Sequence, residues 1–264
     1  MGWKRGRGRA VAGALLLSLT GVASSEASAQ EKKSVEVPLR LEAGRLIVQV
    51  EAGDGEAMDF MVTNGQGLTL LSQSLVDRLG PAPELTLGGI EVPTEGSVVV
   101  PDERFREDGV SFEGIVGANT LNRFDALFDV PGGRLVLKEV SGAVQWPGVA
   151  LSDPMSIQVY HGVALAMDAE VNGTSYRASL DLGRKVSVAN QGLAQAEGLG
   201  SGGGVQLRVA GVDRAAHPVE VRELDIFQRW SPDGEPFLLM GIPLVEDCAL
   251  SISWAHQELR TCSP

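Results

Sequence analysis

Asp181 is the residue whose type and setting best suit chemistry, because a carboxylate between a strand-like run and a glycine turn can act as a general acid or base. The chain nearly repeats itself around this point. Residues 54–80 and 172–198 align without a gap and share the pairs Gly55/Gly173, Gly65/Gly183, Gln73/Gln191, Leu75/Leu193 and Gly80/Gly198. Thr63 is the equivalent of Asp181, and its hydroxyl can donate a hydrogen bond but cannot act as a base near neutral pH.

The repeat continues further along the chain. Gly117 aligns with Gly241, and the similarity extends to Leu135 and Leu259. Each half also contains two apolar residues followed by a glycine, Ile115-Val116-Gly117 in the first half and Leu239-Met240-Gly241 in the second. Counted from glycine to glycine, this segment lies 52 residues after Gly65 and 58 residues after Gly183. The chain therefore uses one supersecondary unit twice, once in each half, as expected for an internal duplication.

Short strands must position these residues. Runs rich in Val, Leu and Phe, separated by Gly or Pro turns, predict strands at 35–41, 46–51, 60–63, 84–87, 97–100 and 126–129 and again at 157–164, 166–171, 176–180, 205–209, 219–224 and 250–254. Asp54-Gly55, Asn172-Gly173 and Gly132-Gly133 are typical hairpin turns. Helices are expected at 72–79 and 191–197, each followed by a glycine suited to a C-cap. The fold class is all-β with a few short helices.

The motifs resemble those of the aspartic peptidase family, in its retropepsin-like bacterial branch. In that family a strand ends in Asp-Thr/Ser-Gly, and an apolar-apolar-Gly segment closes each lobe. The resemblance covers nearly the whole chain after residue 29, twice, and is closest from Gly117 to Leu137. It implies two pseudo-symmetric β-barrel lobes with a cleft between them, Asp181 at the retained position of the catalytic pair and Thr63 at the degenerate one.

Three departures from the family pattern bear on function. Peptide cleavage in this family needs two facing carboxylates that share one proton, and Thr63 cannot replace one of them. Asp59 lies four residues upstream, about 13 Å away along a strand, and cannot replace it either. Asn64 and Leu182 stand where the family has hydroxyls that lock the two loops together. The first half also contains no Tyr for a flap, although Phe105 or Phe112 could border the cleft.

Asp181 therefore has three interpretations: a vestige of a catalytic pair, a structural carboxylate in a tight glycine turn, or a working catalytic group. We expect a non-catalytic module that binds an extended peptide or protein segment in the cleft by β-strand addition. One alternative is an active endopeptidase in which two chains of a homodimer each supply Asp181, although a monomer is expected. Another is a structural protein of the cell envelope. No cofactor and no metal site are expected.

The first 29 residues have the pattern of a secretory signal peptide. A basic start is followed by the apolar stretch 10–23, which is shorter than the roughly 20 residues of a membrane span, and by Ala27-Ser28-Ala29. Their loss removes four basic residues and one acidic one, so the net charge changes from -12 to -15. A periplasmic or secreted protein that avoids nucleic acid and has no membrane span is expected. Residues 30–145 and 146–264 would form the two lobes.

Two further predictions concern the end of the chain and an acidic loop. Cys248 and Cys262 flank a run that alternates as two strands, and a hairpin centred on Ala255 would place them opposite each other for a disulfide. The acidic segment 102–108 has no calcium-ligand pattern and is interpreted as a solvated loop.

Overall fold

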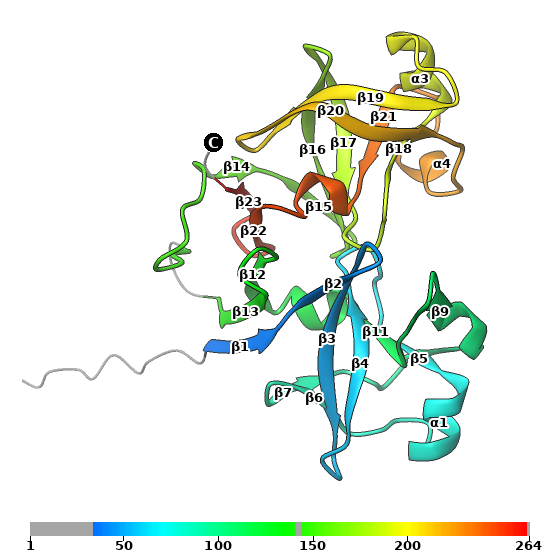
Figure 1. Ribbon diagram of the computed structural model, residues 1–264, viewed down its shortest axis with the longest axis vertical. Helices are drawn as coiled ribbons and strands as arrows, with labels where there is room; N and C mark the ends of the chain where they lie inside the picture. Colours follow the sequence, from blue (N-terminus) through cyan, green and yellow to red (C-terminus); the bar gives the residue numbers. More distant parts are fainter. Residues whose placement is uncertain (1–33, 141–143, 263–264) are drawn as a thin grey trace, which may run out of the picture. The chain divides into compact units, whose positions relative to one another are not determined.

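The computed structural model describes residues 34–140 and 144–262, and these residues form an all-β fold with two lobes (Figure 1). The expected fold class is thereby confirmed. The predicted signal peptide lies outside the described residues. None of the helices in the described part of the chain has the length and apolar composition needed to cross a bilayer.

The first lobe is built on one twisted sheet that forms a half-barrel. Its strands follow the order β7-β6-β3-β4-β11-β5-β8, with β2 paired to β3. The bounds are β2 Arg40–Glu42, β3 Arg45–Ala52, β4 Ala57–Val62, β5 Leu70–Ser72, β6 Leu85–Leu87, β7 Ile90–Val92, β8 Val98–Val100 and β11 Gly114–Val116. Helix α1 (Gln73–Leu79) begins where Ser72 Oγ accepts a hydrogen bond from Leu75 N, and it ends at Gly80 as the sequence predicted.

The second lobe is a closed six-stranded barrel. Six strands form the ring in the order β16-β17-β21-β18-β20-β19, which a pairing of β16 with β19 closes, and β15 adds to β16 as a seventh strand. The bounds are β15 Gln158–Tyr160, β16 Ala164–Val171, β17 Thr174–Leu180, β18 Ser187–Ala189, β19 Gly202–Val209, β20 Val212–Val221 and β21 Phe237–Met240. Helices α3 (Gln191–Glu197) and α4 (Phe227–Trp230) and the 3₁₀ helix η2 (Ile242–Leu244) complete it.

A third sheet takes strands from both halves of the sequence, in the order β1-β13-β12-β22-β23-β14. Its central pair is β12 with β22, which run antiparallel from Asp125 opposite Ser253 to Asp129 opposite Ala249. The buried Ser253 Oγ donates to Asp125 Oδ1 over 2.6 Å. The bounds are β1 Ser34–Pro38, β12 Phe124–Asp129, β13 Arg134–Glu139, β14 Met155–Ser156, β22 Ala249–Ser253 and β23 Glu258–Thr261.

The remaining short elements of the first half lie close to the sheet edges or the cleft described below. They are 3₁₀ helix η1 (Asp102–Phe105), the hairpin of β9 (Arg106–Glu107) and β10 (Val110–Ser111), and helix α2 (Ala118–Leu121). The proposed lobe boundary near residue 146 falls in the segment between β13 and β14, where Trp146 Nε1 donates to Ser251 Oγ of the shared sheet (2.7 Å). That boundary stays a prediction.

Most of the strands and both of the helices expected from the sequence are present close to their predicted bounds. Asn172 and Gly173 both have positive φ, 50° and 86°, and join β16 to β17 as the two-residue turn that the dipeptide predicts. The strand expected at 157–164 is wrong. His161 and Gly162 have positive φ and turn the chain between β15 and β16, since glycine adopts this conformation without steric cost.

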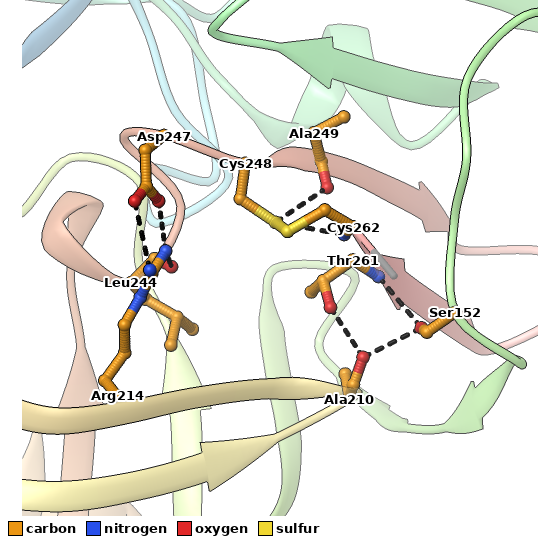
Figure 2. Close-up of a disulfide and its surroundings, with 9 residues drawn as sticks. All are labelled: Ser152, Ala210, Arg214, Leu244, Asp247, Cys248, Ala249, Thr261 and Cys262. Atoms are coloured by element: carbon orange, nitrogen blue, oxygen red, sulfur yellow. Dashed lines mark hydrogen bonds and ion pairs between the residues drawn. A yellow bond between two sulfur atoms is a disulfide. The ribbon is translucent and has the colours of Figure 1, made fainter. Parts of the chain in front are cut away.

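Cys248 and Cys262 form the expected disulfide, with Cα atoms 5.3 Å apart (Figure 2). The predicted hairpin register is wrong by one residue. Ser253 pairs with Glu258, so four residues with Gln257 at positive φ make the turn, and Cys262 forms a bridge with Leu151 instead of facing Cys248. The bond remains feasible because the two Cα atoms lie within the usual disulfide range.

The disulfide should stabilise the fold by restricting the unfolded chain. Its sequence separation is 14 residues, for which the chain-entropy model gives about 3 kcal/mol. The double variant Cys248→Ala/Cys262→Ala is therefore expected to lose about this much unfolding free energy in urea denaturation. Intact mass without reductant should show two hydrogens fewer than after reduction, and an unchanged mass on reduction would contradict the bond.

Candidate functional site

Thr63 and Asp181 follow equivalent strands, β4 and β17, in the two lobes. Each strand pairs in parallel with the apolar segment of its own half: Val62 lies opposite Val116, and Leu180 opposite Met240. Thr63 N then donates to Val116 O (3.1 Å), and Asp181 N to Met240 O (2.9 Å). We call residues 63–65 and 181–183 the motif loops. The sequence repeat is thus also a repeat of backbone hydrogen bonds.

Gly117 and Gly241 occupy the same structural position in the two lobes. A Cβ at Gly117 would lie 2.6 Å from Gln66 O and Leu68 O, and one at Gly241 would lie 2.6 Å from Arg184 O and 2.8 Å from Val186 O. Such distances are too short for any side chain. Both positions therefore require glycine, because the chain after each motif loop passes directly against this segment.

The structure brings Thr63 and Asp181 into direct contact between the lobes. Thr63 Oγ1 donates to Asp181 Oδ1 over 3.2 Å. Each side chain also accepts from the glycine of its own loop, Gly65 N to Thr63 Oγ1 (2.9 Å) and Gly183 N to Asp181 Oδ1 (2.8 Å). A Cβ on Gly65 would lie 1.9 Å from Asp181 Oδ1, so this close approach depends on the missing side chain.

The second oxygen of Asp181 is also engaged. Arg184 Nε donates to Asp181 Oδ2 over 3.2 Å. The carboxylate therefore accepts from a hydroxyl, a backbone N–H and a guanidinium, and no second carboxylate is among its partners in the described part of the chain. Asp59 pairs with Arg40 instead, at 2.7 Å, and takes no part in the site.

Asn64 links the two motif loops by itself. Its amide nitrogen donates to Leu180 O (2.7 Å), and its amide oxygen accepts from Leu182 N (2.9 Å). Asn64 is fully buried, and so is the Leu182 side chain, which packs in the main hydrophobic core. The sequence showed that Leu182 lacks a hydroxyl. It did not show that one amide, having both a donor and an acceptor, satisfies the opposite loop.

A cleft of about 530 Å³ opens over Thr63 and Asp181. Apolar side chains of Met61, Ile115 and Val186 form part of its wall. Polar and charged residues from both lobes form the rest, namely Arg45, Gln66, Glu107, Arg184, Lys185, Glu220 and Arg222. The cleft thus combines a short apolar surface with many charged groups.

The acidic segment 102–108 is not merely a solvated loop. Glu107, on the β9–β10 hairpin, pairs with Arg45 Nη2 and with Lys185 Nζ (3.3 Å), and Asp108 pairs with Lys185. The Arg45 hydrogen bond holds the pKa of Glu107 below its usual range, and Lys185 does the same for Asp108. Lys185 thus ties this hairpin to the second lobe.

Sequence reasoning missed this contact, although one local signal for the hairpin exists. Asp108-Gly109 is a turn dipeptide, and both residues have positive φ, 52° and 80°. Phe105 and Phe112 do not border the cleft around Asp181. They lie buried beneath the hairpin and pack edge to face, with ring centroids 5.6 Å apart.

A buried histidine supports the second-lobe segment. Ser187 Oγ accepts from Gly241 N (2.9 Å) and lies 2.7 Å from His217 Nε2. Burial lowers the pKa of His217 to about 4, and the positive charge of Arg214 contributes less. A neutral ring can accept a hydrogen bond from the Ser187 hydroxyl at Nε2. His217 thus orients the hydroxyl that accepts from Gly241 N.

No known protein-family model matches this chain, and no curated protein matches it significantly. Within residues 34–140 and 144–262, no group of three or more His, Cys, Asp or Glu side chains is placed to hold a metal ion. The geometry of the cleft therefore has to carry the functional argument.

Removing the Asn64 amide should destabilise the junction of the lobes. Asn64→Ala leaves Leu180 O and Leu182 N buried without their partners, and each such loss costs about 1–3 kcal/mol. A decrease in unfolding free energy of about 2–6 kcal/mol is expected in urea denaturation. Asn64→Thr, which restores one acceptor, should recover part of it. A decrease below about 0.5 kcal/mol for Asn64→Ala would mean that the bridge contributes little.

His217 should make the protein less stable in acid. Its pKa is about 4 in the folded state and 6.5 when unperturbed, so the unfolded chain binds the proton first as the pH falls through this window. Stability should be fully present above pH 6.5 and fall by about 3 kcal/mol towards pH 4.

The measurement is unfolding free energy against pH for the native chain and for His217→Gln. The variant should lack this part of the slope, and His161→Gln, at an exposed histidine, should keep it. Equal slopes for the native chain and His217→Gln would contradict the assignment, whatever the variant's stability at pH 7.

Proposed function

We propose that this chain is an exported, aspartic-peptidase-like protein whose interlobe cleft binds an extended peptide or protein segment without cleaving it. The observation that carries the proposal is the contact between Thr63 Oγ1 and Asp181 Oδ1, 3.2 Å apart at equivalent strand ends. A hydroxyl faces the single carboxylate at the place where the family chemistry needs a second carboxylate.

The bonding around Asp181 argues against a proton-sharing pair. Acid–base cleavage needs one carboxylate to activate water while the other protonates the scissile carbonyl. Both oxygens of Asp181 accept hydrogen bonds, and one of them is held by the Arg184 guanidinium. Loss of a general acid or base costs on the order of 100-fold to 10,000-fold in rate.

The walls of the cleft suit an extended ligand. Its volume of about 530 Å³ lies in the range of ordinary ligand pockets, and Met61, Ile115 and Val186 offer apolar contacts for side chains. Main-chain groups of a peptide in extended conformation would supply the remaining hydrogen bonds. The disulfide Cys248–Cys262 supports export, because disulfides persist in oxidising compartments.

The proposal predicts binding without cleavage. Residues 30–264, incubated with a library of short peptides from about pH 3 to 7, should retain some members on affinity capture and leave them uncut. Gln66→Trp, which fills part of the cleft, should weaken capture about tenfold or more. Gln195→Trp, on the exposed face of α3, is the matched control and should bind like the native chain.

Restoring a carboxylate tests the chemical part of the proposal. Thr63→Asp should bind one additional proton in acid titration, since two close carboxylates share one. It should gain little peptidase activity, because Arg184 still engages Asp181. Robust pepstatin-sensitive cleavage by the unaltered chain, lost in Asp181→Asn, would overturn the proposal, and a dimeric mass in solution would then favour a homodimeric peptidase.

A further inference from the structure

In the described part of the chain, the cleft contains cationic N–H donors without a partner beside carboxylates that are already paired. Its three carboxylates are all paired with cations of the same cleft. Asp181 pairs with Arg184 (3.2 Å), Glu220 with Arg222 (3.4 Å), and Glu107 with both Arg45 and Lys185. A ligand therefore meets carboxylates that are already engaged.

Arg184 is the cation with the most free hydrogen-bonding capacity near Thr63 and Asp181. Only its Nε is engaged, and within the described residues neither terminal nitrogen of its guanidinium has a hydrogen-bond partner. Its side chain is 33% exposed and lines the cleft. The bond to Asp181 holds one edge of the guanidinium and leaves the two terminal nitrogens for a ligand.

We infer that Arg184 binds a carboxylate of the peptide that occupies the cleft, an inference that rests on the proposed function. The two terminal nitrogens of a guanidinium form parallel hydrogen bonds that match the two oxygens of a carboxylate. Arg222, which is 53% exposed and paired with Glu220, lies in the same cleft. Gln66 is the residue of the first lobe that aligns with Arg184 in the repeat, and its amide is uncharged. The preference for an anion is therefore expected on the second-lobe side of the cleft.

The charge of the whole protein limits the ligand further. The net charge, -12 for the full chain and -15 without residues 1–29, repels polyanions at long range, and this repulsion grows with each negative charge on the ligand. The cleft should therefore select a peptide with a single carboxylate among neutral or basic neighbours, not an acidic run. That carboxylate comes either from an internal Asp or Glu side chain or from a peptide C-terminus.

Three peptide pools distinguish these sources. The first has a central Glu and blocked ends, the second a central Gln and blocked ends, and the third a central Gln and a free C-terminal carboxylate. All have the same uncharged random flanks. At low ionic strength and pH 7, the native chain should capture the first or the third pool about tenfold better than the second. Preference for the first identifies a side chain, and preference for the third a C-terminus.

Arg184→Gln should abolish the preference while uncharged peptides still bind, and Arg184→Lys should retain part of it. Arg229→Gln, which removes an exposed positive charge outside the cleft, should leave it unchanged. Equal capture of all three pools, or a preference that survives Arg184→Gln, overturns this inference but leaves the proposed function standing. Failure of every pool to bind overturns both.

Discussion

Buried hydrogen bonds hold the two motif loops together, and the arrangement of the cleft follows from this contact. Asn64 reaches across to Leu180 O and Leu182 N, and this amide holds the strand ends of two separate sheets against each other. Because these groups are buried, an unpaired N–H or C=O here would cost more than the hydrogen bond contributes on balance. The contact between Thr63 and Asp181 follows from it, since each residue is a direct neighbour of this bridge.

The loops can meet only because the residues around them are small or apolar. Gly65 lets Asp181 approach its backbone, and Gly117 and Gly241 let the apolar segments pass behind the two loops. In the second lobe, Ser187 and His217 add a buried hydrogen-bond pair behind Gly241. Closely packed segments therefore support both motif loops from behind. The chemistry of the site depends on the side chains that these loops present to the cleft.

Those side chains engage both oxygens of Asp181. With Thr63 on one oxygen and Arg184 on the other, the carboxylate is a hydrogen-bond acceptor within the protein. Its clearest structural effect is to fix the guanidinium of Arg184 at the cleft wall. The site thus presents a guanidinium to the cleft beside Thr63 and Asp181.

Local structure and the duplication could be predicted from the residues alone. Alternating apolar residues, turn dipeptides such as Asn172-Gly173 and capping glycines predict backbone conformation because each acts within a few residues. The gapless repeat likewise placed Thr63 and Asp181 at equivalent positions, and residue types with spacing indicated the pairing of Cys248 with Cys262. The sequence did not predict the exact register of this hairpin. The alternation of apolar and polar residues is compatible with a turn of three residues as well as with the observed turn of four.

The electrostatics of the site depend on tertiary packing and could not be predicted from the residues alone. Arg45 donates to Gly183 O across 138 residues of sequence, and Lys185 pairs with Asp108 from the other lobe. Asn64 was visible as a departure from the motif, but its reach to Leu180 O depends on a loop 116 residues away. Local patterns fix which way a strand faces. They do not fix which distant charge it will meet, because that depends on how whole sheets pack together.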